Sequence, residues 1–476
     1  MIVPLRPAAA PAAKSAPVPL LAGNSQGSAT SVQQVGYAFL ILYLFLIYSR
    51  IFDVKLSNLH IPGISLRIII VTLVLTGAFV GALKTPIGKW FGFLTLWFVL
   101  SIPTSVWRRG SKDVLVDAWI PAFVIFLSTV GLIVNYQQCR RAIYTVAWAL
   151  FVLTLIAVFW GSTEETGRLY LPHGKFSNPN EMGQALLLGM PLWGLALLDT
   201  QSFVKKAFSS GVMFLMLIMV SKTGSRGSFI AFAATLFVVF LRSSAIGKLK
   251  LIIGGFVILA LLVGLMPGKL VRRYTSFSEE TDPVVNVDDD YDPDMQATAA
   301  SSTKSRRELL KKSIKFTLRH PVFGVGPGMF PVAEDADAKE NGQRVGKWQG
   351  THNSYTQVSS ELGIPALVAY VAIIVLSLKQ TTALYRRTRG DPRLKGIGYC
   401  AMALNYCLVV YAVSVIFDYI AYSSMLSVFA GLAAALHQTA PYEIDRITAT
   451  PAPAPMVPFA EFRPRWRPTA GAPQQA

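Results

Sequence analysis

Residues 141–160, RAIYTVAWALFVLTLIAVFW, contain a single charged side chain, Arg141. As a helix, a block of this length spans about 30 Å, the thickness of the hydrocarbon core of a bilayer. Such blocks must be helical, because lipid offers no hydrogen-bond partner to an exposed backbone. The chain contains twelve of them, near 35–49, 66–83, 88–106, 114–134, 141–160, 181–199, 206–222, 227–242, 248–266, 360–378, 396–415 and 418–437.

The composition agrees with a membrane protein. Of 476 residues, 53% are hydrophobic and 15% are charged, and the mean hydropathy is +0.46, whereas a soluble domain carries about 25% charged residues. This excludes a soluble enzyme, a disordered protein and a collagen-like fibre. The three cysteines lie in or beside apolar stretches and indicate no disulfide framework. The net charge of +18 is explained by loops that face anionic lipid, so we expect no nucleic-acid partner.

The chain is therefore predicted to be an all-α polytopic membrane protein with about twelve transmembrane helices. Residues 1–34 and 438–476, rich in Ala and Pro, are predicted to be disordered cytoplasmic tails. Residues 35–266 and 360–437 would hold helices one to nine and ten to twelve. Residues 267–359 would form a large periplasmic loop, and loops of that length usually carry function.

The orientation follows from basic residues in short loops, which favour the cytoplasm. The loop after the tenth block carries six of them: Lys379, Arg386, Arg387, Arg389, Arg393 and Lys395. The loop with Arg108, Arg109 and Lys112 argues the other way. Within the long loop, Ser301–Arg319 is predicted to be an amphipathic helix that lies on the membrane surface or over a cavity, with apolar Leu309, Leu310, Ile314, Phe316 and Leu318.

Three polar segments on the outer face could carry chemistry. In the first, Lys222–Ser228, glycines flank Arg226, whose planar fork matches phosphate oxygens. Ser225 precedes it as a supporting residue. An arginine at a membrane edge is costly unless it is paired, although it could also be an interfacial anchor that reaches water. The segment is thus a candidate anion site.

The second segment runs from Gly167 to Gly183 and contains Arg168 and Lys175. Its Ser-Asn-Pro-Asn run, with Asn178 and Asn180, predicts a turn in which Asn180 caps the following helix. A solvated loop with a helix cap explains the same pattern, and His173 is interpreted as an ordinary loop histidine.

The third segment, Gly350–Gly363, contains His352, Asn353 and Tyr355. In a helix, His352, Tyr355, Ser359 and Glu361 would lie on nearby faces. A histidine at the membrane boundary can accept a proton near neutral pH, so His352 is a candidate general base. A histidine that is only hydrogen-bonded at a helix start remains the alternative.

Two further motifs are discounted. The Gly324–Gly328 segment resembles a phosphate loop, but Pro327 removes a donor, and we expect a turn that closes the amphipathic helix. The acidic run Asp288–Asp294 lacks the glycine and the final glutamate of a calcium-binding EF-hand. No Cys/His metal spacing is present, and no metal or cofactor is predicted.

Together, four blocks resemble the O-antigen ligase and O-antigen polymerase family of bacterial envelope glycosyltransferases. These are Arg168 with the Phe176–Asn180 turn; Gly224–Gly227; Ser305–Leu309 leading to His320–Gly328; and His352-Asn353 followed by Gly363. The resemblance covers roughly residues 35–437. It implies a fold like that of C-type glycosyltransferases and metal-independent, inverting transfer of a glycan from undecaprenyl diphosphate to an acceptor hydroxyl.

The resemblance also implies roles for individual residues. Arg168 and Arg226 would bind the diphosphate, assisted by Arg306 or its neighbour Arg307. His352 would act as general base, with Asn353 orienting the acceptor. Ala366 stands where the ligase pattern has glycine, threonine or tyrosine, so a ligase acting on lipid A-core and a polymerase of O-antigen or exopolysaccharide both stay open.

The expected partners are the lipid-linked donor, a glycan or lipid A-core acceptor, the bilayer and a possible chain-length regulator. The expected location is the bacterial inner membrane, with the site facing the periplasm. A transporter of lipid-linked sugars or small anions is the alternative from another class. Transporters usually show internal repeats, and no half-to-half repeat is evident here.

Overall fold

The computed structural model describes residues 30–51, 61–164, 166–172, 174–265, 268, 270, 293–342 and 348–449. The described residues are 82% helical with nearly no strand, which confirms the all-α prediction. Its helices are α1 Ser31–Ser49, α3 Ile61–Thr76, α4 Ala78–Lys84, α5 Pro86–Ser101, α6 Arg108–Val114, α7 Ile120–Leu132, α8 Tyr136–Trp160, α9 Pro179–Asp199, α10 Phe203–Lys222, α11 Arg226–Arg242, α12 Ala245–Leu265, α14 Pro293–Arg319, α15 Phe330–Glu340, α16 Ser354–Leu362, α17 Ile364–Thr388, α18 Lys395–Ser414 and α19 Ser424–Ala449. Short elements complete it: π-helix Leu115–Trp119, 3-10 helices Lys175–Ser177 and Pro392–Leu394, and antiparallel strands β1 Ser162–Thr163 and β2 Leu169–Tyr170.

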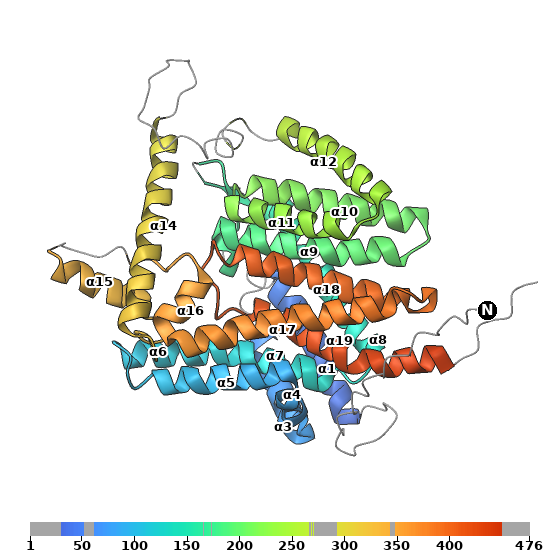
Figure 1. Ribbon diagram of the computed structural model, residues 1–476, viewed down its shortest axis with the longest axis horizontal. Coiled ribbons are helices and arrows are strands. Elements are labelled where there is room, and N and C mark those ends of the chain that lie inside the picture. The colour runs from blue at the N-terminus through green and yellow to red at the C-terminus, as the bar shows by residue number, and fades with distance from the viewer. Residues whose placement is uncertain are drawn as a thin grey trace, which may run out of the picture.

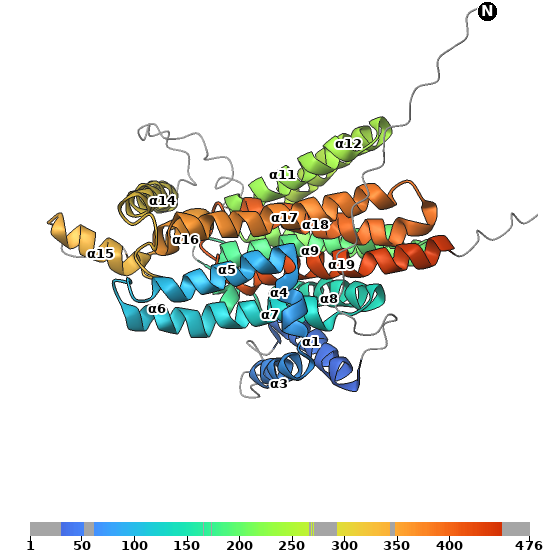
Figure 2. The same ribbon diagram turned by 60° about the horizontal axis from the view of Figure 1, so that its bottom comes forward.

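The long helices run side by side in one bundle (Figures 1 and 2). Near its centre, α9 packs against α8, α10 and α18, and α17 packs against α5, α18 and α19. Their contact faces bury apolar side chains in one continuous core, and the hydroxyls of Tyr370 and Tyr411 hydrogen-bond within it at 2.7 Å. The opposite faces of outer helices stay apolar but exposed, such as Phe256 on α12. Exposed apolar side chains on helices of this length are typical of lipid-facing surfaces.

In the described part of the chain, eight helices are long and apolar enough to cross a membrane, and the bent pair α3–α4 would make nine. Each of the twelve predicted blocks overlaps at least one helix, but the count of twelve spans is not confirmed. The helices α5 and α11 have 16 and 17 residues, fewer than the roughly 20 of a typical span. The long apolar helices indicate a multi-pass α-helical membrane protein.

The structure corrects several predicted boundaries. The block 66–83 is two helices bent by 83°, with Gly77 between them at φ +63°, a conformation that costs glycine little. The block 360–378 is divided at Gly363, and the block 418–437 begins as a non-helical connection that ends at Ser424. Since α19 continues to Ala449 and α1 begins at Ser31, the predicted tails are too long. The remainders of both tails lie outside the described residues.

The three helices α14, α15 and α16 lie together at one end of the bundle, here called the α14 end (Figure 1). The predicted amphipathic helix lies within α14. Leu309 and Phe316 are buried against Phe330 of α15, whereas Ile314 and Leu318 are exposed. Three basic side chains of α14 pair with α15: Lys312 with Glu334 at 2.6 Å, and Lys315 and Arg319 with Asp337 at 2.6 and 3.1 Å. Residues 288–292 of the acidic run lie outside the described part.

The glycine-rich segment Gly324–Gly328 is a turn after α14, as predicted, and it docks on α16. The backbone N–H groups of Val325 and Gly326 donate to the carbonyl oxygens of Ser360 and Glu361 at 2.9 and 3.0 Å. A Cβ at Gly324 would lie 2.2 Å from the backbone of Glu361, so only glycine allows this approach. The Glu361 carboxylate is buried and accepts hydrogen bonds from Tyr422 Oη and Gly328 N at 2.7 and 2.9 Å.

Candidate active site

The turn between α10 and α11 positions Arg226 as the first residue of α11. Ser225 caps this helix by accepting from Ser228 N at 3.3 Å. The turn is held close to α9 through Gly183, where a Cβ would lie 2.8 Å from the hydroxyl oxygens of Ser228 and Thr223. Arg226 therefore lies at a helix N-terminus, where the backbone N–H groups also favour the binding of anions.

Arg168 is joined to this turn by hydrogen bonds. It precedes β2, and its Nε donates to the Thr223 carbonyl oxygen at 2.9 Å, while Nη2 donates to Asn180 Oδ1 at 2.9 Å. The predicted cap is corrected here, because Asn178 rather than Asn180 caps α9, by accepting from Asn180 N at 3.0 Å. Asn180 instead orients Arg168. Lys175 begins a 3-10 helix, but its side chain and His173 lie outside the described residues.

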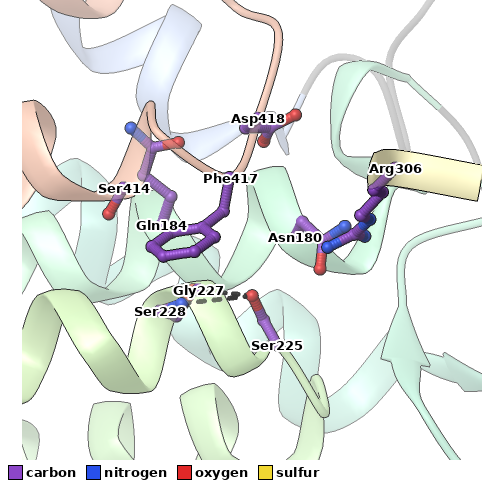
Figure 3. A pocket seen from close by; sticks show the side chains of 9 residues that line it. All are labelled: Asn180, Gln184, Ser225, Gly227, Ser228, Arg306, Ser414, Phe417 and Asp418. Atoms are coloured by element: carbon purple, nitrogen blue, oxygen red, sulfur yellow. Dashed lines mark hydrogen bonds between the residues drawn. The ribbon is translucent and has the colours of Figure 1, made fainter. Parts of the chain in front are cut away.

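Arg306 reaches a pocket from α14, whereas its neighbour Arg307 is exposed. The pocket is narrow, and Figure 3 shows its lining: Asn180, Gln184, Ser225, Gly227, Ser228, Arg306, Ser414, Phe417 and Asp418. Burial and the positive charge of Arg226 lower the pKa of Arg306, while Asp418 opposes this. The two arginines are thus close enough to repel each other, and an anion between them would relieve that repulsion.

His352 lies beside this pocket. It precedes α16 rather than belonging to it, so the predicted helical alignment with Tyr355, Ser359 and Glu361 is wrong. Its backbone has a φ of +51°, and its ring packs edge-on against Tyr419, with centroids 5.4 Å apart. Nδ1 is buried without a hydrogen-bond partner among the described residues. Burial, helped by the charge of Arg306, lowers the pKa of His352 to about 4, so the imidazole is neutral at pH 7 and able to accept a proton.

The residues that follow His352 fix its position. Asn353 caps α16, with Oδ1 accepting from the backbone N–H groups of Tyr355 and Thr356 at 2.9 and 3.1 Å. Tyr355 points into the bundle, where its hydroxyl donates to the Ala412 carbonyl oxygen at 2.9 Å. Ser354 Oγ donates to the Asp418 carbonyl oxygen at 2.9 Å. These contacts give Asn353 and Tyr355 supporting positions and tie His352 to the connection that carries Asp418.

The structure therefore groups the predicted residues without placing all of them in one cavity. Asn180, Ser225 and Arg306 line the pocket, Arg168 contacts Asn180, and the charge of Arg306 acts on His352. Sequence reasoning missed Gln184, Ser414 and Asp418 because they lie within apolar blocks. The signal was available, since polar side chains within membrane segments are costly and frequently functional. In the described part, no group of three His, Cys, Asp or Glu side chains could hold a metal ion.

Comparison with known families identifies the region that contains this site. Residues 211–371, about a third of the chain, match the O-antigen ligase family. This segment is similar to the O-antigen ligase family. The O-antigen ligase match includes Arg226, Arg306 and His352, and it confirms the resemblance predicted from the sequence. A search of curated proteins found no match.

The match supports an enzyme of the O-antigen ligase or polymerase type. Such an enzyme acts in a membrane on a lipid-linked glycan donor and an acceptor. Arg168, Asn180, Gln184 and Asp418 lie outside the matched O-antigen ligase segment but beside its residues in space. The candidate site thus combines the matched segment with α9 and the α18–α19 connection.

Proposed function

We propose that this O-antigen ligase-type protein transfers a glycan from undecaprenyl diphosphate to an acceptor hydroxyl. The observation that carries the proposal is that Arg306 lies within electrostatic range of both Arg226 and His352, so that two cations and one neutral base meet at the same end of the bundle. A diphosphate is a good leaving group once its charge is neutralised. Arginines present bidentate donors that do this, so the residues present suffice without a metal ion.

The proposed reaction is a single displacement. The acceptor oxygen attacks the anomeric carbon, its proton passes to the imidazole of His352, and the bond between that carbon and the diphosphate oxygen breaks. The electron pair leaves with undecaprenyl diphosphate, which Arg168, Arg226 and Arg306 stabilise. Attack from the side opposite to the leaving group inverts the anomeric configuration. Proton transfer of this kind contributes about 10²–10⁴-fold to the rate.

Donor binding should make His352 a better base. Without a ligand, the positive charge of Arg306 helps to hold the pKa of His352 near 4. A bound diphosphate places negative charge beside Arg306 and so raises that pKa, because a nearby anion favours the imidazolium form. His352 would then accept the proton most readily when the donor is in place.

The proposed location is the bacterial inner membrane, with the α14 end facing the periplasm. The basic residues support this, because Lys205 and Lys206 lie in the first turn of α10, and Arg389 and Arg393 lie between α17 and α18, at helix ends away from the α14 end (Figure 1). The loop that argued against the orientation, near Arg108, packs against the Gly324–Gly328 turn at the α14 end, where Val106 N donates to the Val325 carbonyl oxygen at 3.0 Å.

The direct test is transfer by purified protein in vesicles supplied with labelled glycan on undecaprenyl diphosphate. The proposal predicts loss of label from the donor and release of undecaprenyl diphosphate. Addition to lipid A-core indicates a ligase, and longer glycan on the carrier indicates a polymerase. Movement of intact donor across the membrane without consumption would contradict the proposal and support a transporter.

A further inference from the structure

His352 is held in an unusual way for a residue that is proposed to accept a proton. A histidine base is ordinarily oriented by a hydrogen bond from its second ring nitrogen to a carboxylate or a backbone carbonyl group. Here Nδ1 is buried and has no such partner within the described part of the chain. The backbone does not favour the observed conformation either, because a φ of +51° is costly for a residue with a Cβ. Other contacts must therefore fix the direction of the imidazole.

The ring of Tyr419 supplies such a contact. It packs edge-on against the His352 ring, with the centroids 5.4 Å apart and the ring planes at 83°, which is one of the arrangements that aromatic pairs prefer. The same ring lies against Gly350, where a Cβ would be 2.5 Å from Tyr419 Cδ2. Only glycine at position 350 allows the ring to come this close. Tyr419 therefore contacts both the histidine and the segment that leads to it.

The backbone on both sides of Tyr419 is held by one hydroxyl group. Ser354 of α16 is fully buried, and its Oγ donates to the Asp418 carbonyl oxygen at 2.9 Å and accepts from Ile420 N at 3.0 Å. In addition, Tyr419 N donates to the Asp418 carboxylate at 2.9 Å. Since Ser354 follows His352 by two residues, the segment that carries the histidine also holds the ring that packs against it.

We propose that Tyr419 is a positioning residue for His352, and that Ser354 holds Tyr419 in place. The inference rests on the proposed glycosyl transfer, in which His352 accepts the proton of the acceptor hydroxyl. An aromatic contact restricts the rotation of the imidazole without occupying the lone pair that must accept the proton. Tyr419 acts through His352 rather than on the diphosphate, because it does not line the pocket that Arg306 enters.

The test compares Tyr419→Leu, which loses the ring, with Tyr419→Phe, which keeps it, in the full chain reconstituted in vesicles. Phe93→Leu on α5 is the matched control, because Phe93 packs edge-on against Trp90 with centroids 6.0 Å apart and is 36% exposed, close to the 40% of Tyr419. We expect turnover to fall about tenfold in Tyr419→Leu, which corresponds to the upper end of the range for one aromatic pair. Tyr419→Phe and Phe93→Leu should match wild type, and the KM for the donor should not change in any variant.

A second measurement does not depend on turnover. An NMR titration of labelled histidine reports the pKa of His352, which burial lowers to about 4. In Tyr419→Leu the imidazole is free to turn toward solvent, so its pKa should rise toward the ordinary value of 6.5. In Tyr419→Phe the pKa should stay near that of wild type. Ser354→Ala should give the same rise as Tyr419→Leu, because the backbone beside Tyr419 is then no longer held.

The outcomes separate this inference from the proposed function. Wild-type turnover in Tyr419→Leu, or an unchanged pKa of His352 in that variant, would overturn the inference. An equal loss of turnover in Tyr419→Phe and Tyr419→Leu would also overturn it, because the hydroxyl rather than the ring would then carry the effect. If the wild-type protein transfers no glycan, the proposed function fails, while the titration still tests whether Tyr419 positions His352.

Discussion

Replacing His352 separates its proposed chemistry from its structural role. The residue has a φ of +51°, and this left-handed conformation costs an L-residue roughly 1–2 kcal/mol. His352→Gly removes that strain but loses the edge contact with Tyr419, worth about 0.5–1.5 kcal/mol. His352→Asn keeps a side chain that tolerates the conformation. Neither variant loses a hydrogen bond of Nδ1, because Nδ1 has no partner in the described structure. In His352→Gly the relieved strain and the lost ring contact nearly cancel. Both variants should therefore fold with wild-type stability.

Activity should respond very differently. Without the imidazole, turnover should fall about 10²–10⁴-fold, the usual contribution of a positioned base. The assay follows labelled glycan in vesicles under saturating donor, with thermal unfolding measured on the same preparations. Turnover within about threefold of wild type in either variant would refute the general-base role, because that ratio is far below the contribution expected of a base. Loss of activity together with loss of folding in both variants would instead assign His352 a structural role.

Three further predictions follow from the same contacts. Arg306→Met should raise the pKa of His352 above its present value of about 4, because the charge of Arg306 lowers it. An NMR titration of labelled histidine measures this pKa. An unchanged pKa would show that Arg306 does not act on His352. Asn180→Ala should weaken donor binding about fivefold to tenfold by removing one contact that orients Arg168, and a donor KM equal to that of wild type would contradict it. Burial raises the pKa of Glu361 to about 7 from 4.5, so folding stability should fall as pH rises between these values; Glu361→Gln should lose this slope in thermal unfolding, and an unchanged slope would assign it to another group.

The membrane fold could be predicted from local sequence because lipid imposes the same demand on every span. Each apolar block had to be largely helical, and each overlaps at least one helix. The ends of the helices were harder to predict, because hydropathy does not distinguish a helix from an apolar connection. The segment from Asp418 to Ser423 therefore looked like the start of a span, although it is a non-helical connection beside the pocket.

Candidate site residues could be named from the sequence where polar residues interrupt apolar blocks, as at Arg226 and His352. It was not predictable where packing between distant helices decides the outcome. Whether Arg306 or Arg307 enters the pocket depends on how α14 is rotated above the bundle, which its own sequence does not specify. Gln184 and Asp418 meet only because α9 packs against α18, and neither segment alone indicates that contact.

The claim that the arginines and His352 form one site is tested most directly by a structure of the protein with undecaprenyl diphosphate, determined by electron cryo-microscopy in lipid nanodiscs. The account predicts diphosphate density within hydrogen-bonding distance of the Arg226 and Arg306 guanidinium groups, beside Arg168, with His352 across the site from the departing oxygen, on the side from which the acceptor attacks. Density for the diphosphate at the other end of the bundle, or contacting none of these arginines, would contradict it.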